Sequence, residues 1–122
     1  MKIQESGEMY LENILVLRDR LERVRSIDIV NYTGYSKPSI SRAVKLLKED
    51  GLICIDNSGY ITLTESGESI AQKILARHQI LSSFLRSIGV DGGTADDDAC
   101  RMEHVISDVT YDCIKSFVEK NN

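Results

Sequence analysis

The chain has 122 residues, of which 42% are hydrophobic and 28% charged, and its formal net charge is −4 at pH 7. This length and balance are typical of one globular domain or two small lobes sharing a core, and they exclude disordered and fibrous chains. No apolar run approaches the ~18–20 residues that cross a bilayer, and the first residues lack a signal-peptide pattern, so we expect a soluble, cytoplasmic protein. Three cysteines are too few, and of the wrong parity, for a disulfide framework.

The charges are distributed unevenly along the chain. Residues 1–63 carry nine basic and nine acidic side chains, whereas residues 64–122 carry six basic and ten acidic ones. Within residues 18–50, eight basic side chains stand against five acidic ones. A local basic surface can bind phosphate while the acidic remainder faces elsewhere, so the net charge does not exclude a nucleic-acid partner. A solvated helix surface is the plain alternative.

Apolar spacing predicts three helices in the first half of the chain. Apolar residues recur at helical spacing over about residues 7–22, and a short helix then follows Ser26 and stops near Gly34, where a left-handed backbone is allowed. The next helix begins at Ser36, which can cap it, and its apolar stripe continues until Gly51 ends it. The second and third of these helices, joined by a tight turn, form a helix-turn-helix.

A β-hairpin is predicted next. Residues 52–55 and 60–63 are β-rich tetrads, and four turn-forming residues separate them. A helix, a helix-turn-helix and a hairpin in this order describe a winged-helix domain, which we expect to occupy residues 1–64. The predicted fold class is therefore mostly α with a small β-hairpin.

The second half of the chain is predicted to be helical. Thr64 caps a long helix that ends at Gly89, residues 91–93 then break the chain, a fifth helix covers about residues 94–106, and Ser107 caps a sixth. We expect residues 65–122 to form a helical domain that binds metal and pairs across a two-fold axis. The expected dimer surface consists of apolar residues of these helices, namely Ala71, Ile74, Leu81, Leu85, Phe117 and Val118.

Three potential ligand side chains are grouped near residue 100. Cys100, Glu103 and His104 stand at i, i+3 and i+4 in the predicted fifth helix, within roughly a 100° arc. A thiolate, a carboxylate and an imidazole on one face suit a transition metal because each offers a lone pair. In the alternative interpretation Cys100 lies in the core while Glu103 and His104 are solvated. Spacing alone leaves both interpretations open.

Other candidate residues are more isolated. His78 lies within the apolar stripe of the long helix, where a histidine is either a hydrogen-bonded core residue or a ligand. Met9 and Glu12 are one turn apart on the first helix, where a core residue beside a surface residue is the plain alternative to a pair of ligands. We interpret Cys54 and Cys113 as packing residues.

Several segments together resemble the diphtheria-toxin-repressor family of iron- and manganese-dependent transcriptional regulators. They are the Glu-Met-Tyr-Leu-Glu run at residues 8–12, the Arg77-His78 pair, residues 99–105 and the helix-turn-helix stretch at residues 24–52. The resemblance covers essentially the whole chain. Its specific signature is Cys-x-x-Glu-His with an upstream Met-Tyr-Leu and Arg-His, whereas a helix-turn-helix alone would not be specific.

The resemblance implies which residues bind the activating metal. Iron-type members use residues that match Met9, Cys100 and the Glu103-His104 pair, and manganese-type members have carboxylates in place of Met9 and Cys100. The manganese type also uses a glutamate that matches Glu12. The chain thus combines an iron-type primary site with a manganese-type glutamate. The implied metal ligands are Met9, Glu12, His78, Cys100, Glu103 and His104.

Two positions depart from the iron-type pattern. The glutamate and histidine that complete an ancillary metal site in those proteins correspond to Ser82 and Asp96 here. Glu12, His78 and Glu103 could still hold a second ion, which gives one or two ions per subunit. Because the chain lacks the small β-rich third domain of longer members, we expect the short, two-domain type.

The DNA-binding surface is expected on the second helix of the helix-turn-helix, whose N-terminal residues reach base edges in the major groove. Short hydroxyls and Pro38 suit contact with thymine methyl groups, and Arg42 reads guanine or holds phosphate, although family members usually carry a less charged side chain there. Arg25, Lys37 and Lys45 are expected to contact phosphate. The predicted DNA-binding residues are Arg25, Ser36, Lys37, Pro38, Ser39, Ser41, Arg42 and Lys45.

The leading hypothesis is a homodimeric repressor that binds operator DNA when it carries a divalent metal and controls metal-homeostasis genes. A bound ion would join the two lobes and set the distance between two recognition helices, whose half-sites lie about 34–36 Å apart. An enzyme is disfavoured because no phosphate loop, HExxH motif or nucleophile elbow occurs. The alternative is a winged-helix regulator that responds to thiol oxidation at Cys100 or to a small organic ligand.

The ligand types predict which metal activates the protein. Thioether and thiolate groups favour softer ions than manganese(II), so Met9 and Cys100 favour iron(II). Glu12 adds a hard oxygen ligand of the manganese type, which keeps manganese(II) as the alternative.

Overall fold

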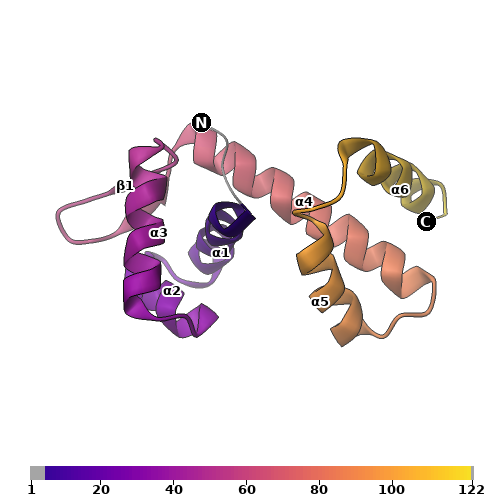
Figure 1. The fold of residues 1–122 in the computed structure, drawn as a ribbon, viewed down its shortest axis with the longest axis horizontal. Coiled ribbons are helices and arrows are strands. Elements are labelled where there is room, and N and C mark those ends of the chain that lie inside the picture. Colours follow the sequence, from indigo (N-terminus) through magenta and orange to yellow (C-terminus); the bar gives the residue numbers. More distant parts are fainter. Residues whose placement is uncertain (1–4, 122) are drawn as a thin grey trace. The chain divides into compact units, whose positions relative to one another are not determined.

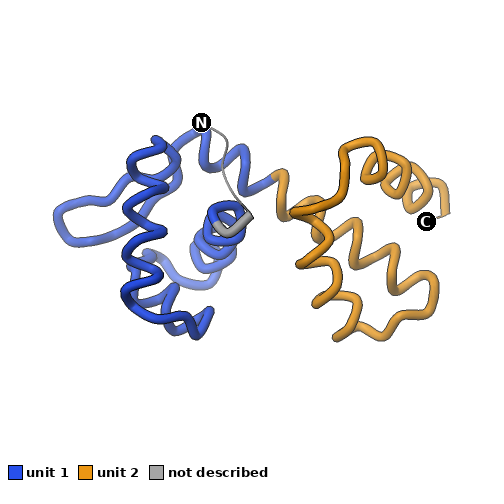
Figure 2. The backbone as a smooth tube through the Cα atoms, viewed as in Figure 1, with its two compact units in different colours: residues 1–72 blue, residues 73–122 orange. Residues whose placement is uncertain are grey.

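The computed structural model describes residues 5–121 of the chain, which divide into two compact units at residues 72 and 73 (Figure 2). Helix α4 begins in the first unit and ends in the second. None of the helices in the described residues is long and apolar enough to span a membrane. The elements in chain order are α1 (Glu5–Arg20), α2 (Ser26–Thr33), α3 (Lys37–Glu49), β1 (Ile53–Ile55), β2 (Ile61–Leu63), α4 (Glu65–Ser87), α5 (Gly92–Met102) and α6 (Asp108–Lys120) (Figure 1).

The first unit contains the predicted helix-turn-helix, formed by α2 and α3, which pack against each other and against α1. Gly34 ends α2 with a φ of 78°, a left-handed conformation that costs glycine no Cβ clash. The Ser36 side chain accepts a hydrogen bond from the backbone N–H of Ser39 and so caps α3, with Pro38 in its first turn. The core-facing residues of α3 are Ile40, Val44 and Leu47.

The hairpin follows α3 as predicted, with each strand one residue shorter than its tetrad. Its register pairs Ile53 with Leu63 and Cys54 with Thr62, so that Ile53 faces the core while Cys54 and Thr62 face solvent. The prediction that Cys54 is a packing residue is therefore wrong, because side chains alternate between the two faces of a strand. The chain between α1 and α2 adds a further bridge, in which the N–H of Ile61 donates to the carbonyl of Val24 over 2.7 Å.

The start of α4 is fixed against the hairpin by backbone contacts. The Thr64 hydroxyl donates to the carbonyl of Gly51 over 2.7 Å and accepts from the N–H of Gly67 over 3.1 Å, which confirms Thr64 as the cap. A Cβ atom at Gly67 would lie 1.9 Å from the carbonyl oxygen of Leu52. Only glycine permits this close approach of helix to hairpin.

The second unit consists of the C-terminal part of α4 with α5 and α6. Side chains of α4 contact both other helices, as in the edge-to-face pair of Phe84 and Phe117, whose ring centroids are 5.9 Å apart. Ser107 caps α6 as predicted, since its Oγ accepts from the N–H of Thr110 over 3.2 Å. The predicted break between the two helices is present but lies earlier, at residues 88–91, because Asp91 accepts from the N–H of Thr94 and makes Gly92 and Gly93 the first residues of α5.

Two further expectations about the second half are corrected. Helix α5 ends at Met102 and not near residue 106, and Cys113 is exposed on α6 and not packed in a core. Four members of the expected dimer surface, Ala71, Ile74, Leu81 and Val118, are already buried within a single chain. The large apolar side chains left exposed in the second unit are Ile88, Val105, Val109 and Phe117.

Candidate metal centre and nucleic-acid interface

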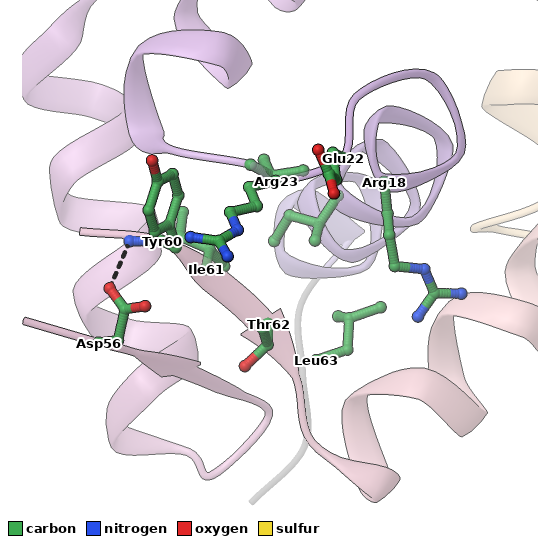
Figure 3. A pocket seen from close by; sticks show the side chains of 10 residues that line it. Arg18, Glu22, Arg23, Asp56, Tyr60, Ile61, Thr62 and Leu63 are labelled. Atoms are coloured by element: carbon green, nitrogen blue, oxygen red, sulfur yellow. Dashed lines mark hydrogen bonds between the residues drawn. The ribbon is translucent and has the colours of Figure 1, made fainter. Parts of the chain in front are cut away.

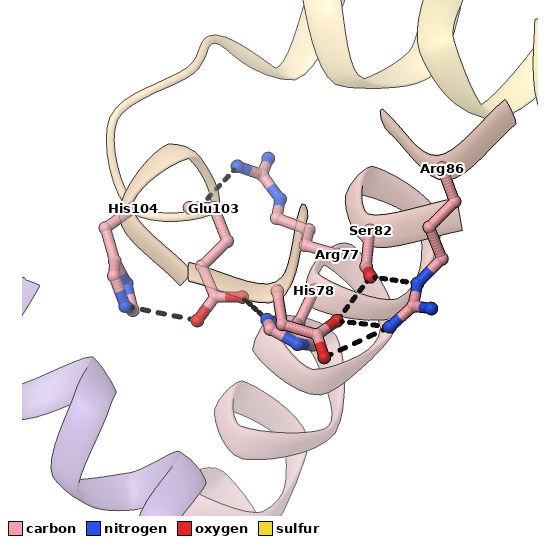
Figure 4. Close-up of polar contacts among 7 residues, drawn as sticks. Arg77, His78, Ser82, Arg86, Glu103 and His104 are labelled. Carbon is pink, nitrogen blue, oxygen red and sulfur yellow. Dashed lines mark hydrogen bonds and ion pairs between the residues drawn. The ribbon is translucent and has the colours of Figure 1, made fainter. Parts of the chain in front are cut away.

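The second unit brings one carboxylate between two imidazoles (Figure 4). Glu103 follows α5 directly as its C-cap, with His104 next to it in the turn, and His78 projects from α4. One Glu103 oxygen, Oε2, lies 3.1 Å from His78 Nδ1, and the other, Oε1, lies 3.2 Å from His104 Nε2. Glu103 is only 1% exposed, and the side chain of His78 is 25% exposed. The alternative in which Glu103 is a solvated surface residue is therefore wrong.

The turn that carries these residues is held by Arg77, which is buried on α4 next to His78. Its guanidinium donates to the carbonyls of Glu103 and Ile106 over 3.4 and 3.5 Å, forms an ion pair with Asp108, and lies 4.9 Å from the ring centroid of Tyr111. These bonds satisfy the carbonyl of Glu103, the C-cap of α5, and that of Ile106 in the turn that follows. In the sequence, Arg77 is notable only as the residue that precedes His78 in the Arg-His pair.

The chemistry of this cluster fits a divalent ion of the iron or manganese type. Two imidazole nitrogens and a carboxylate are ligands that such ions accept, and a buried carboxylate is stabilised by a bound cation. His78, Glu103 and His104 could therefore each contribute one donor atom.

The remaining predicted ligands occupy different elements. Cys100 is exposed on α5, one turn before Glu103. Met9 and Glu12 lie one turn apart on α1, in the first unit. The thioether sulfur of Met9 accepts a hydrogen bond from the phenol of Tyr35, with 3.9 Å between Sδ and Oη.

The positions that depart from the iron-type pattern form a polar network of their own (Figure 4). The Ser82 hydroxyl donates to Asp96 Oδ1 over 2.6 Å, and Nη2 of Arg86 lies 3.2 and 3.1 Å from the two Asp96 oxygens. The Ser82 hydrogen bond and then the Arg86 guanidinium hold the pKa of Asp96 below its usual value. A protein cation thus already neutralises this carboxylate and joins α4 to α5.

The predicted DNA-reading helix presents its polar residues to solvent. Lys37, Ser41 and Lys45 are exposed on α3. The Ser36 hydroxyl donates to Ser39 Oγ over 2.9 Å, and Arg42 Nη2 donates to the same oxygen over 3.4 Å. Ser36 thus has the structural role of a helix cap, and Arg42 is held against the first turn of α3.

The hairpin and the segment before α2 add two residues, Tyr60 and Arg23, that are absent from the predicted DNA-binding set. Tyr60 precedes β2, and the guanidinium carbons of Arg25 and Arg23 lie 4.3 and 5.0 Å from its ring centroid. Arg23 and Tyr60 also line a cavity of about 260 Å³ in the first unit, together with Arg18 and Asp56 (Figure 3). The signal available in the sequence was a pair of arginines spaced by two and an aromatic residue in the hairpin. Stacking on Tyr60 keeps both guanidinium groups beside the hairpin.

Comparison with known proteins identifies relatives that match most of the chain. Residues 64–122 match the family described as iron dependent repressor, metal binding and dimerisation domain. The transcriptional regulator MntR of Escherichia coli is 35% identical over 112 residues, which are 92% of this chain and 72% of that protein. Diphtheria toxin repressor of Corynebacterium diphtheriae is 30% identical over 105 residues, which are 85% of this chain and 46% of that protein.

A solved structure of similar fold is a manganese-dependent transcriptional repressor in complex with manganese. It superposes with a TM-score of 0.84 at 28% identity, over 93% of this chain and 52% of that one. The chain spans about half the length of this repressor and of diphtheria toxin repressor. None of these relatives supports the alternative of a regulator that responds to thiol oxidation or to an organic ligand.

Proposed function

We propose that this chain represses metal-homeostasis genes by binding operator DNA as a metal-loaded homodimer. The premise is that the chain belongs to the diphtheria-toxin-repressor family of metal-dependent transcriptional regulators. Family membership agrees with the resemblance found in the sequence. The observation that carries the proposal is the carboxylate of Glu103 between the imidazoles of His78 and His104, in a chain whose first unit contains an exposed helix-turn-helix.

Residues 1–64 would form the winged-helix DNA-binding domain, and residues 65–122 the helical domain that binds metal and dimerises. The match of residues 64–122 to a metal-binding and dimerisation family supports this division. When bound, the metal would supply a positive charge shared by ligands of both domains, and so restrict the position of the recognition helix. The proposed ligands are Met9, Glu12, His78, Cys100, Glu103 and His104.

On the DNA, α3 would enter the major groove with its N-terminal turns. Ser39, Ser41 and Arg42 would face base edges, with Pro38 beside them, whereas Ser36 would act mainly by capping the helix. Phosphate contacts would come from the basic residues around this surface. These are Arg25, Lys37 and Lys45, supported by their exposure on the first unit.

We further propose iron(II) as the preferred activating metal, with manganese(II) as the alternative. Met9 and Cys100 offer soft sulfur donors, which favour iron(II) over manganese(II). The oxygen of Glu12 and the similarity to a manganese-dependent transcriptional repressor solved in complex with manganese support the manganese alternative. A second ion, held by Glu12, His78 and Glu103, would use only hard or borderline ligands.

Anaerobic metal titration of the full chain tests these proposals. Binding to a duplex selected from random sequences is followed at controlled free iron(II), manganese(II) and zinc(II). We expect no specific binding in chelator, activation by iron(II) at lower free concentration than by manganese(II), and a shift toward manganese(II) in the double variant Met9→Asp, Cys100→Glu. Specific binding that survives chelator would refute the metal-dependent function, and activation by manganese(II) at far lower concentration would refute the iron preference.

A further inference from the structure

Tyr35 lies in the turn between the two helices of the helix-turn-helix, where contacts to α1 and α2 hold it. Its backbone N–H donates to Oγ1 of Thr33, the last residue of α2, over 3.2 Å. Its ring meets the ring of Tyr10 on α1 edge-on, with centroids 6.2 Å apart and an angle of 80° between the planes. The residue after Tyr35 is Ser36, the cap of α3. Tyr35 therefore links α1 and the end of α2 to the start of the DNA-reading helix.

The Tyr10 ring against which Tyr35 packs is itself buried, with only 8% of Tyr10 exposed. The side chain of Tyr35 itself is 46% exposed. Its ring is thus held on one side by α1 while its hydroxyl remains able to reach a polar atom.

The polar atom that the hydroxyl reaches is the thioether sulfur of Met9, 3.9 Å away. A methionine side chain has three rotatable bonds, so its sulfur is poorly positioned unless something holds it. A thioether sulfur accepts hydrogen bonds only weakly, but it has two lone pairs. One lone pair can accept the phenol O–H while the other remains available to a metal ion.

We propose that Tyr35 is a positioning residue that couples the Met9 thioether to the first turn of α3. The inference rests on the proposed function, in which Met9 is a metal ligand. A sulfur held by a metal restricts the Tyr35 hydroxyl, and the backbone of Tyr35 continues directly into the Ser36 cap. Occupancy of the metal site is thereby transmitted within the first unit to the turns that face base edges. The coupling needs no displacement of the helices, because it acts by restricting one side chain and the cap beside it.

The matched variants are Tyr35→Phe and Tyr32→Phe. The first removes only the hydroxyl that reaches Met9 and keeps the ring against Tyr10. The control removes the hydroxyl of a similarly exposed tyrosine on α2, whose ring lies instead 5.4 Å from the guanidinium carbon of Arg20. Melting followed by circular dichroism establishes that both variants fold.

Cobalt(II) affinity of the full chain, measured by competition with a chelator, is the first readout. We expect Tyr35→Phe to weaken cobalt(II) binding about two- to fivefold, the range for loss of one weak hydrogen bond, and Tyr32→Phe to leave it unchanged. In a Met9→Leu background, which has no sulfur to orient, Tyr35→Phe should have no further effect on affinity. An equal effect of Tyr35→Phe in both backgrounds would overturn the coupling.

Amide exchange in the metal-free protein is the second readout. We expect faster exchange over residues 36–40 in Tyr35→Phe than in wild type, and wild-type exchange there in Tyr32→Phe. Identical exchange and identical cobalt(II) affinity in both tyrosine variants would overturn the inference, even where wild-type DNA binding does require metal. Metal-independent DNA binding by the wild type would instead refute the proposed function, so the two failures are distinguishable.

Discussion

At the scale of single residues, the candidate metal centre is built around a carboxylate that is almost entirely removed from water. A buried carboxylate is costly unless positive or hydrogen-bonding groups surround it, and Glu103 has an imidazole against each of its oxygens. Arg77 fixes the backbone on which Glu103 and His104 lie through hydrogen bonds to two carbonyls. The site is therefore organised by a charged residue that is not itself a predicted ligand.

Glu103→Gln should weaken metal binding more than a Glu-to-Gln substitution at an exposed position does. The amide keeps the size of the side chain but removes the negative charge and one acceptor oxygen between the imidazoles. We expect at least a tenfold loss of manganese(II) and iron(II) affinity, about the lower bound found when groups that support a metal site are changed. Competition with a chelator measures this loss of affinity. The control is Glu119→Gln, because Glu119 is exposed on α6. Equal affinities in the two variants would exclude Glu103 as a ligand.

At the scale of elements, short side chains at helix starts decide where the helices begin. Ser36, Thr64, Asp91 and Ser107 each accept a hydrogen bond from a backbone N–H in the first turn of the following helix. Such caps satisfy donors that the helix itself cannot.

Ser36→Ala should destabilise the first unit by about 0.5–2 kcal/mol, the usual cost of losing a helix cap. The lost groups are the acceptor for the Ser39 N–H and the donor to the Ser39 hydroxyl. Urea unfolding measures the change in the free energy of unfolding. Ser41→Ala is the matched control, because Ser41 is exposed on the same helix beyond its first turn. A loss no greater than that of the control would contradict the capping role of Ser36.

Asp96→Asn tests the contact between α4 and α5 through its pH dependence. Because hydrogen bonding to Ser82 and Arg86 lowers the pKa of folded Asp96, the charged form stabilises the fold at pH values above its unfolded pKa of about 3.9. This stabilisation is lost as the pH falls through the lowered folded pKa. We therefore expect acid to lower the melting temperature of wild type more than that of Asp96→Asn, and Asp97→Asn to behave as wild type. Parallel melting curves for wild type and Asp96→Asn down to pH 3 would contradict the role of this network.

At the scale of the whole molecule, the apolar surface that stays exposed after folding differs from the dimer surface that helical periodicity predicts. The stripe of α4 that includes Ile74 and Leu81 is covered within one chain, whereas Val105 and Val109 are exposed at 67% and 74%. Large apolar side chains that stay this exposed in one unit favour a contact with another protein there. We therefore place the contact of the proposed homodimer on this exposed group.

Val109→Lys should weaken the homodimer without unfolding the protein. Burying a lysine against the partner requires its charge to be desolvated, whereas the same lysine on the surface of a monomer stays in water. Sedimentation in the presence of metal should show a larger dimer dissociation constant than for Asp112→Lys, an exposed polar position on the same helix. An unchanged dimer in Val109→Lys would exclude this part of α6 from the interface.

Local features of the fold could be predicted from the sequence because the groups that cause them are neighbours in the chain. The caps at Ser36, Thr64 and Ser107, the left-handed Gly34 and the hairpin all involve partners within a few residues. The break expected at residues 91–93 lies instead at residues 88–91, for a related reason. Two glycines were given more weight than the capping carboxylate of Asp91, which satisfies the first turn of α5 in spite of them.

The candidate metal site was only half determined by the sequence. Helical spacing indicated that Cys100, Glu103 and His104 are near one another, but whether they are ligands or core residues remained open. That choice depends on His78, which is 25 positions before Glu103 in the chain and meets its carboxylate only in the folded second unit.

What the sequence by itself determined is the order of elements, the caps at Ser36, Thr64 and Ser107, and the family, since these depend on local periodicity and on motifs of adjacent residues. Only the tertiary structure decided which apolar faces are covered, that Cys54 faces solvent, that Arg77 closes the turn before α6, and that Tyr35 reaches Met9. Periodicity assigns a side chain to one face of a helix or strand. It does not say which distant segment packs on that face, because that pairing is set by the burial and hydrogen bonding of groups far apart in the chain.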